Sequence, residues 1–456
     1  MVDNKKFFNF NLLKTSLIFL ILSVLMYIVL LKYYIPITNE IVPWGDPFTY
    51  ELGYYELLNR ISSDAPNNSV VDVIKNIFVA NWYWLQKLLI FTFSPLLINE
   101  PYSICIINFF VYTIASILFY IMLTEFDVRK NLSRIIAILF WFYPINYSFK
   151  EYSALPMMGL DSTFLGALYC LIFSYLTFLR KPEYIPYQFL FSFSLCAALI
   201  GRGNSISVMI MLLFFPSIYF LYGIIKNKNY QVLKNFLIPA IFFICTLSWF
   251  FYWQLKPILN YYSVFRGFIT SDIMLMLPYL KHVPGIFFLY PEPSEINLMQ
   301  KTDVRVLTIS IICHIINFLS LILSIVLKNR KFKIIAFSGL FIFYATFFIN
   351  LLLWMNPHIS IYNAQLIWAP MRIGFVLSLG FIFIIFFNKL NPKLLNFIFI
   401  VSAMILLTIS NSTYKKQYEF IFANKSENSP QNIKKIDKLI KDNSKPNSAI
   451  ILWFGP

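Results

Sequence analysis

An all-α fold, built as a bundle of about eleven membrane-spanning helices, is predicted by composition and by the spacing of apolar residues. Of the 456 residues, 59% are hydrophobic and 13% are charged, whereas soluble proteins are about half apolar and about a quarter charged. A soluble core of this size could not bury so much apolar surface. Lipid is therefore expected to be the solvent for most of the chain.

Each long apolar run is predicted to be a helix, because a backbone in lipid must satisfy its own hydrogen bonds. The two shortest runs need extension or burial within the bundle to cross about 30 Å. A further stretch, 88–98, is broken by Ser94 and Pro95 and is expected to lie in the interface or to re-enter. The runs are 15–31, 102–123, 135–149, 163–179, 188–201, 205–225, 235–255, 306–327, 334–354, 372–388 and 394–411.

Lysine and arginine are concentrated in alternate connections between these runs, which predicts a cytoplasmic N-terminus. The basic connections contain Lys14, Arg129, Lys130, Arg134, Arg180, Lys181, Lys226, Lys228, Lys234, Lys328, Arg330, Lys389 and Lys393. Acidic residues concentrate on the opposite side, in the first outer loop. We therefore predict one transmembrane domain, 1–411, with outer loops at about 32–101 and 256–305. A small extracytoplasmic tail, 412–456, would follow.

Nucleic-acid binding, disulfides and metal sites are not expected from the sequence. The net charge of +16 comes from short basic clusters between apolar runs, which is a topology signal rather than a nucleic-acid-binding stripe. All five cysteines lie inside apolar runs without a CxxC pair, so disulfides and zinc are not expected. The three histidines show no metal-ligand spacing, and no metal ligands are predicted.

The segment 44–55 of the first outer loop holds the main candidate site. Asp46 precedes Pro47, a pattern that is also typical of a helix N-cap. Beside aromatic residues and partly desolvated, the Asp46 carboxylate could act as a general base toward a hydroxyl group. Trp44, Tyr50 and Tyr54 would supply flat faces and donors for a sugar ring.

This layout resembles the class C glycosyltransferase superfamily, whose multi-spanning enzymes use polyprenyl-phosphate-linked sugar donors. The resemblance rests on Asp46 followed by Tyr50 just beyond the first helix, and on a long first loop. It continues in three short segments that end or join helices on the expected outer side. These are Gly159-Leu160-Asp161, Gly201-Arg202-Gly203-Asn204 and Pro370-Met371-Arg372. Asp46-Pro47 stands where aminoarabinose and protein O-mannosyl transferases carry an Asp-Glu pair.

The resemblance implies transfer of a sugar to a glycan, lipid or protein acceptor at the outer face, with inversion. Polyprenyl phosphate would leave as an anion and would need positive charge. Arg202 and Arg372, each expected at an outer helix end, are the candidate phosphate ligands, with Arg266 as a fallback. Snorkelling to lipid headgroups is the alternative for both helix-end arginines.

Asp161 is interpreted as a helix cap, a partner of Arg202 or a group that orients the acceptor. No cofactor is required, although Mg²⁺ or Mn²⁺ held by Asp46, Asp161 and phosphate stays open as an alternative. Besides the donor and the acceptor, the expected partners are membrane lipids, in the cytoplasmic membrane of a microbe.

Two rival functions stay open. An O-antigen-type polymerase or ligase would place its chemistry later in the chain, around Arg266 to Arg305. A lipid or glycan transporter is disfavoured by the expectation that charges within the apolar runs cluster near helix ends.

Overall fold

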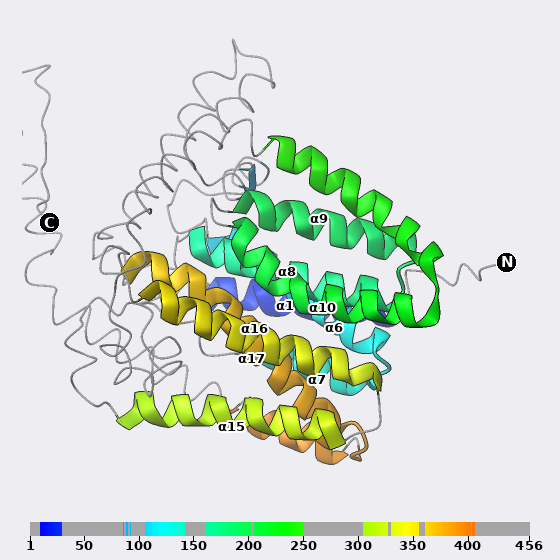
Figure 1. Ribbon diagram of the computed structural model, residues 1–456. Coiled ribbons are helices and arrows are strands. Elements are labelled where there is room, and N and C mark those ends of the chain that lie inside the picture. Colours follow the sequence, from blue (N-terminus) through cyan, green and yellow to red (C-terminus); the bar gives the residue numbers. More distant parts are fainter. Residues whose placement is uncertain are drawn as a thin grey trace, which may run out of the picture.

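The computed structural model describes residues 10–29, 105–141, 160–201, 205–249, 304–326, 330–354, 361–391, 393–402 and 404–405, with positions 85, 88, 89 and 92. Within these ranges the chain is helical apart from short turns and contains no strand. The helices pack side by side as a bundle (Figure 1). The all-α prediction is therefore confirmed for the described part. The tail and nearly all of both large outer loops lie outside it.

Every predicted apolar run overlaps a helix of the structure. Among the described residues, five helices are long and apolar enough to cross a membrane: Ile107–Glu125, Thr163–Arg180, Val208–Asn227, Tyr230–Trp249 and Pro370–Phe387. The full bounds are α1 (Phe10–Val29), α6 (Cys105–Glu125), α7 (Lys130–Trp141), α8 (Leu160–Arg180), α9 (Ile185–Gly201), α10 (Ser205–Asn227), η5 (Tyr230–Phe236), α15 (Val304–Val326), α16 (Arg330–Trp354) and α17 (Ile361–Phe387). A shorter apolar helix, Lys393–Ser402, follows α17. The count of about eleven spans stays a prediction.

The largest boundary error concerns α17, which begins at Ile361 rather than at residue 372. The sequence predicts that Pro370-Met371-Arg372 opens this helix. A proline inside a helix removes a backbone donor and clashes with the preceding turn. In the structure Pro370 lies inside the helix, as Pro216 does in α10. Neighbouring helices make such prolines tolerable in membrane bundles, where they help to satisfy the freed backbone groups.

The centre of the bundle is an aromatic cluster shared by α6, α7 and α8. Phe119 stacks on Phe173 with ring centroids 4.3 Å apart, and Phe140 meets the edge of Tyr169 at 4.8 Å. All four side chains are buried. Because offset and edge-on aromatic pairs add to the free energy of apolar burial, this cluster fixes α8 as the central helix.

On α15 the usual distribution of side chains is reversed. The face turned into the bundle carries the buried residues Ser310, Cys313, Asn317, Ser320 and Ser324, and the exposed face carries Ile311, Ile312, Ile315, Phe318, Ile322 and Ile325. A soluble amphipathic helix has its apolar stripe inside. Small and polar residues at the helix interface, with large apolar ones outside, are instead typical of helices that pack in lipid.

The closest helix pair is α16 with α17, which meet at two glycines. A Cβ atom on Gly374 would lie 2.6 Å from the backbone nitrogen of Phe343 and 2.7 Å from the carbonyl oxygen of Gly339. A Cβ atom on Gly339 would lie 2.8 Å from the carbonyl oxygen of Gly374. Only residues without a side chain allow two helix backbones to approach so closely.

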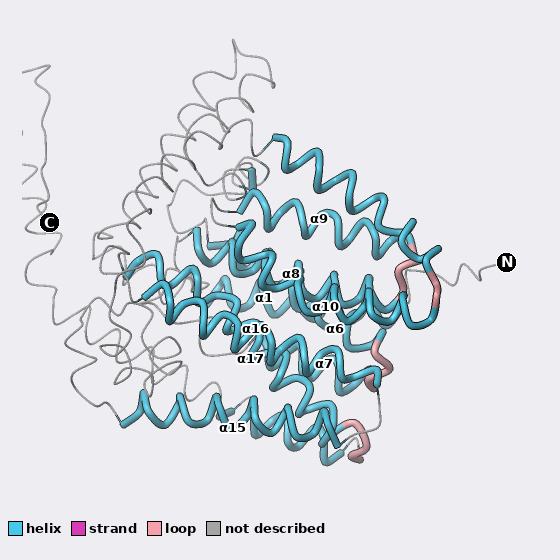
Figure 2. Tube along the Cα trace, viewed as in Figure 1, coloured by secondary structure: helices cyan, strands magenta, loops and turns pink. Residues whose placement is uncertain are grey.

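The described connections lie together at one end of the bundle, which we call the basic end (Figure 2). They join α6 to α7, α8 to α9, α10 to η5, and α17 to the next helix. Arg129, in the first of them, donates from its backbone to the Asn388 side chain (3.1 Å) and from its guanidinium to the Leu390 carbonyl (2.9 Å). Connections 259 residues apart therefore meet, as the alternating pattern of basic segments predicts.

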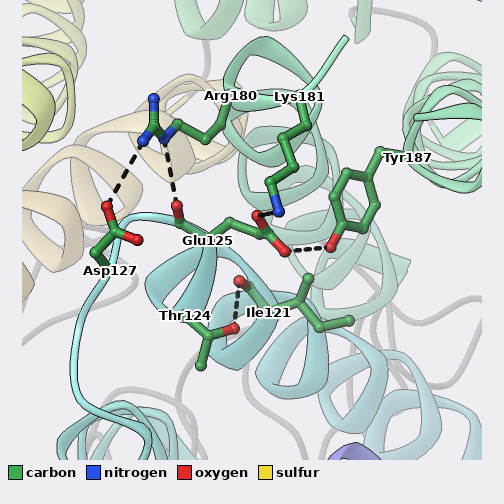
Figure 3. A network of polar contacts seen from close by, with 7 residues as sticks. All are labelled: Ile121, Thr124, Glu125, Asp127, Arg180, Lys181 and Tyr187. Carbon is green, nitrogen blue, oxygen red and sulfur yellow. Dashed lines mark hydrogen bonds and ion pairs between the residues drawn. The ribbon is translucent and has the colours of Figure 1, made fainter. Parts of the chain in front are cut away.

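A polar network ties α6 to α8 and α9 at this end (Figure 3). Glu125 accepts a hydrogen bond from the Tyr187 hydroxyl at 2.6 Å and pairs with Lys181 at 2.6 Å. Arg180 pairs with Asp127 at 3.6 Å and donates to the Glu125 carbonyl oxygen at 3.3 Å. Glu125 is the least exposed of the paired groups, so its two contacts should contribute most to stability.

Replacing Glu125 by alanine is expected to lower the free energy of unfolding by about 1–2 kcal/mol, because the half-buried Tyr187 hydroxyl and Lys181 lose their acceptor. Thermal unfolding of the purified protein in detergent measures the change. Glu183→Ala is the matched control, since Glu183 is an exposed carboxylate of the same connection, and we expect less than about 0.5 kcal/mol. Equal effects of the two variants would show that the network does not stabilise the bundle.

Candidate functional site

Most of the predicted site falls beyond what the structure describes. Six residues lie outside the described ranges: Trp44, Asp46, Tyr50, Tyr54, Arg202 and Arg266. Asp161 lies in the first turn of α8, at a helix start as predicted, and its side chain is not among those described. The alternative metal site at Asp46 and Asp161 likewise lies outside the described residues. Arg372 is the predicted site residue whose side chain can be placed.

Arg372 is deeply buried, with 5% of its surface exposed. It is the twelfth residue of α17, so the prediction that it sits at a helix end is wrong. Snorkelling to headgroups is also contradicted, because the side chain is enclosed by protein rather than directed along the lipid-facing surface. The reason is the early start of α17, which adds three helical turns before Arg372 and places it within the packed bundle.

The depth of Arg372 follows from helix geometry. Fifteen residues separate it from Phe387, the last residue of α17 at the basic end. At 1.5 Å per residue this is about 23 Å, against about 30 Å for a bilayer's hydrocarbon core. With Phe387 at one face of such a layer, Arg372 would lie beyond its middle, toward the end of the bundle opposite the basic end.

A buried hydrogen bond lies at a similar depth on two neighbouring helices. The Thr163 hydroxyl donates to the Asn108 side-chain oxygen at 2.7 Å, joining α8 to α6. Both residues are buried. Each precedes the basic-end residue of its helix, Glu125 or Arg180, by seventeen residues, or about 26 Å. Asn108, Thr163 and Arg372 therefore lie at similar distances from the basic end, and we call these three residues the polar layer.

One side of α17 faces α6. The Cβ position of Gly380 lies 3.4 Å from the Phe119 ring of α6. Arg372 precedes Gly380 by eight residues, which is about 80° of rotation around the helix. The Ser116 hydroxyl, which is also buried on α6, has no hydrogen-bond partner among the described residues. Sequence reasoning missed Asn108 and Thr163; the only signal was an asparagine inside the apolar run 102–123.

Chemically, the polar layer is suited to an anion rather than to a metal. A guanidinium in a low-dielectric interior attracts negative charge more strongly than one in water, and its planar donors match phosphate oxygens. Within the described part, no three His, Cys, Asp or Glu side chains come together in a way that could hold a metal ion. His314 instead contacts Tyr344, with 3.4 Å between Nδ1 and the hydroxyl oxygen.

These features define the class as far as the structure goes: an α-helical bundle compatible with a membrane protein, with a buried polar layer that contains one arginine. No protein-family model matches the sequence, and no curated protein matches it. The resemblance to class C glycosyltransferases stays a prediction from the sequence.

Proposed function

We propose that the protein is a multi-pass glycosyltransferase of the cytoplasmic membrane of a microbe. It would transfer a sugar from a polyprenyl-phosphate donor to a glycan, lipid or protein acceptor on the outer face. The observation that carries the proposal is the burial of Arg372 about 23 Å from the basic end. If the basic end faces the cytoplasm, as the positive-inside rule predicts, this arginine lies at the depth of the outer leaflet.

In the proposed reaction Asp46 accepts the proton of the acceptor hydroxyl while the hydroxyl oxygen attacks the anomeric carbon of the donor sugar. The bond between that carbon and the phosphate oxygen breaks, and its electron pair leaves with the polyprenyl phosphate. A single displacement inverts the anomeric centre. Arg372 would stabilise the departing negative charge through charge-assisted hydrogen bonds, with Arg202 and Arg266 as further ligands.

Replacing Arg372 by glutamine is expected to lower kcat/KM for sugar transfer about a hundredfold, because the leaving phosphate loses its buried cation. The assay uses purified protein in proteoliposomes with a polyprenyl-phosphate-linked hexose, and follows transfer of the sugar to an acceptor. Arg372→Lys should recover part of the loss, since lysine keeps the charge without the planar donors.

Arg129→Gln is the matched control, because Arg129 lies exposed at the basic end, and it should leave transfer within about twofold. Thermal unfolding shows whether each variant is folded. Full transfer by a folded Arg372→Gln variant would remove Arg372 from the reaction.

The same observation favours a second function, transport of a lipid-linked anion. Arg372 contradicts the expectation that charged residues within the apolar runs lie near helix ends, and buried ionisable groups far from the ends are typical of transport paths. The proteoliposome experiment separates the two. A transporter would move the lipid-linked sugar between leaflets with its chemical structure unchanged, whereas a glycosyltransferase would release polyprenyl phosphate.

A further inference from the structure

The connection between α10 and η5, together with its flanking residues, concentrates positive charge. Lys226, Lys228 and Lys234 are all exposed, and the chain has no aspartate or glutamate between residues 205 and 249. Among the described residues none of these three lysines forms an ion pair. At the same end, by contrast, Arg180 pairs with Asp127 and Lys181 pairs with Glu125.

Lys228 occupies a backbone conformation that is unfavourable for a lysine. Its φ is 53°, in the left-handed region. The amide of Lys228 donates to the Ile225 carbonyl (3.2 Å) and that of Asn229 to the Ile224 carbonyl (3.1 Å), which together form a Schellman motif at the end of α10. Glycine is the usual residue at this position because a Cβ atom is strained there. A lysine at such a position suggests that its charge has a use.

Two exposed tyrosines lie on either side of Lys226 and Lys228. Tyr222 and Tyr230 are 61% and 57% exposed, and the Lys226 ammonium lies 5.8 Å from the centroid of the Tyr222 ring. Tyrosines at membrane interfaces place their rings at the level of the lipid headgroups. Directly beside them, Ile225 and Leu237 expose apolar side chains to the outside of the bundle. Positive charge, aromatic rings and an apolar surface therefore follow one another over a few residues.

We propose that Tyr222, Lys226, Lys228, Tyr230 and Lys234, which we call the lysine turn, bind the phosphate headgroup of an anionic phospholipid. The lipid belongs to the leaflet at the basic end, and its acyl chains lie along the exposed apolar side chains. Those apolar neighbours favour a lipid over a soluble phosphate ester. The proposal is independent of the polar layer and holds for a glycosyltransferase or a transporter.

The test compares spin-labelled phosphatidylglycerol with spin-labelled phosphatidylcholine in bilayers that contain the purified full-length protein. The relative association constant measures how strongly the protein selects the anionic headgroup. The combined variant Lys226→Gln, Lys228→Gln, Lys234→Gln should lose at least tenfold in selectivity, because each lysine near an anionic headgroup contributes about fivefold. The matched pair Lys389→Gln, Lys393→Gln, at the same end, should change it by a smaller factor than the combined variant, because no tyrosine lies within ten residues of either lysine.

The variant Lys228→Gly distinguishes a loss of lipid selectivity caused by removal of charge from one caused by misfolding. It removes one lysine and relieves the left-handed strain, so selectivity should fall about fivefold while the melting temperature stays the same or rises. This variant decides the question if the combined variant does not fold. Retained selectivity in either folded variant would overturn the proposal. An equal loss in the matched pair, or displacement of the labelled lipid by soluble glycerol phosphate, would overturn it as well.

Discussion

Replacing Asp46 by asparagine is expected to lower kcat for sugar transfer between a hundredfold and ten-thousandfold, the usual contribution of a general base. Asparagine has nearly the shape of aspartate and keeps hydrogen-bonding capacity, but it cannot accept the proton of the acceptor hydroxyl. The KM for the donor should therefore change little. Steady-state kinetics in proteoliposomes, with thermal unfolding as a check on folding, measure the effect.

The pH dependence provides a second readout for the same variant. A base must be deprotonated to work, so transfer by the natural protein should fall as the pH drops through the pKa of Asp46. The residual activity of Asp46→Asn should lack this acidic limb. Glu51→Gln and Asp64→Asn, which remove carboxylates of the same predicted outer loop, should stay within about twofold. Undiminished transfer by Asp46→Asn would remove the proposed mechanism, whereas transport of a lipid-linked anion should not depend on this proton acceptor.

The positions of the helices could be predicted closely because, in lipid, the apolar character of a run of residues is enough to make it helical. An apolar run must satisfy its own backbone hydrogen bonds, so composition alone placed the run 163–179 within two or three residues of α8. The start of α17 could not be predicted in the same way. There the sequence contains Asn363, Gln365 and Pro370, and whether helix continues through such residues depends on what the neighbouring helices offer them.

The candidate site was predictable only residue by residue. Arg372 could be selected because it is a cation at the expected outer end of an apolar run, where few other cations lie. Its burial could not, because burial depends on which helices surround α17. The hydrogen bond between Asn108 and Thr163 joins residues 55 positions apart, and that between Arg129 and Asn388 joins residues 259 apart. Pairings of this kind follow from side-chain shape in the assembled bundle, which composition does not record.

Replacing Gly374 by alanine is expected to lower the free energy of unfolding by about 3 kcal/mol. The added methyl group would overpack the contact, because the atoms it meets cannot move aside as a flexible side chain could. The added Cβ would lie 2.6 Å from the Phe343 nitrogen and 2.7 Å from the Gly339 oxygen, and both are backbone atoms. The helices α16 and α17 would have to separate, which weakens the contacts along their shared surface. Titration of the detergent-solubilised protein with a denaturing detergent measures the change.

Gly223→Ala in α10 is the matched control, because a Cβ atom there would have nothing within 4 Å. Alanine is favoured over glycine in a helix by up to about 1 kcal/mol, so this variant should be as stable as the natural protein or more so. The two substitutions therefore have opposite expected signs. Gly339→Ala should resemble Gly374→Ala, and the double variant should cost less than the sum, because helices already separated by one Cβ accommodate the second.

The same substitution also tests whether the packing of α16 on α17 positions the polar layer. Gly374 lies two residues from Arg372 on α17, so a separation of the two helices displaces the Arg372 guanidinium sideways within the bundle. Gly374→Ala should therefore reduce transfer in the fraction that remains folded, while Gly223→Ala should not. If folded Gly374→Ala protein kept both its stability and its transfer, the glycine contact would have no role in holding Arg372 in place.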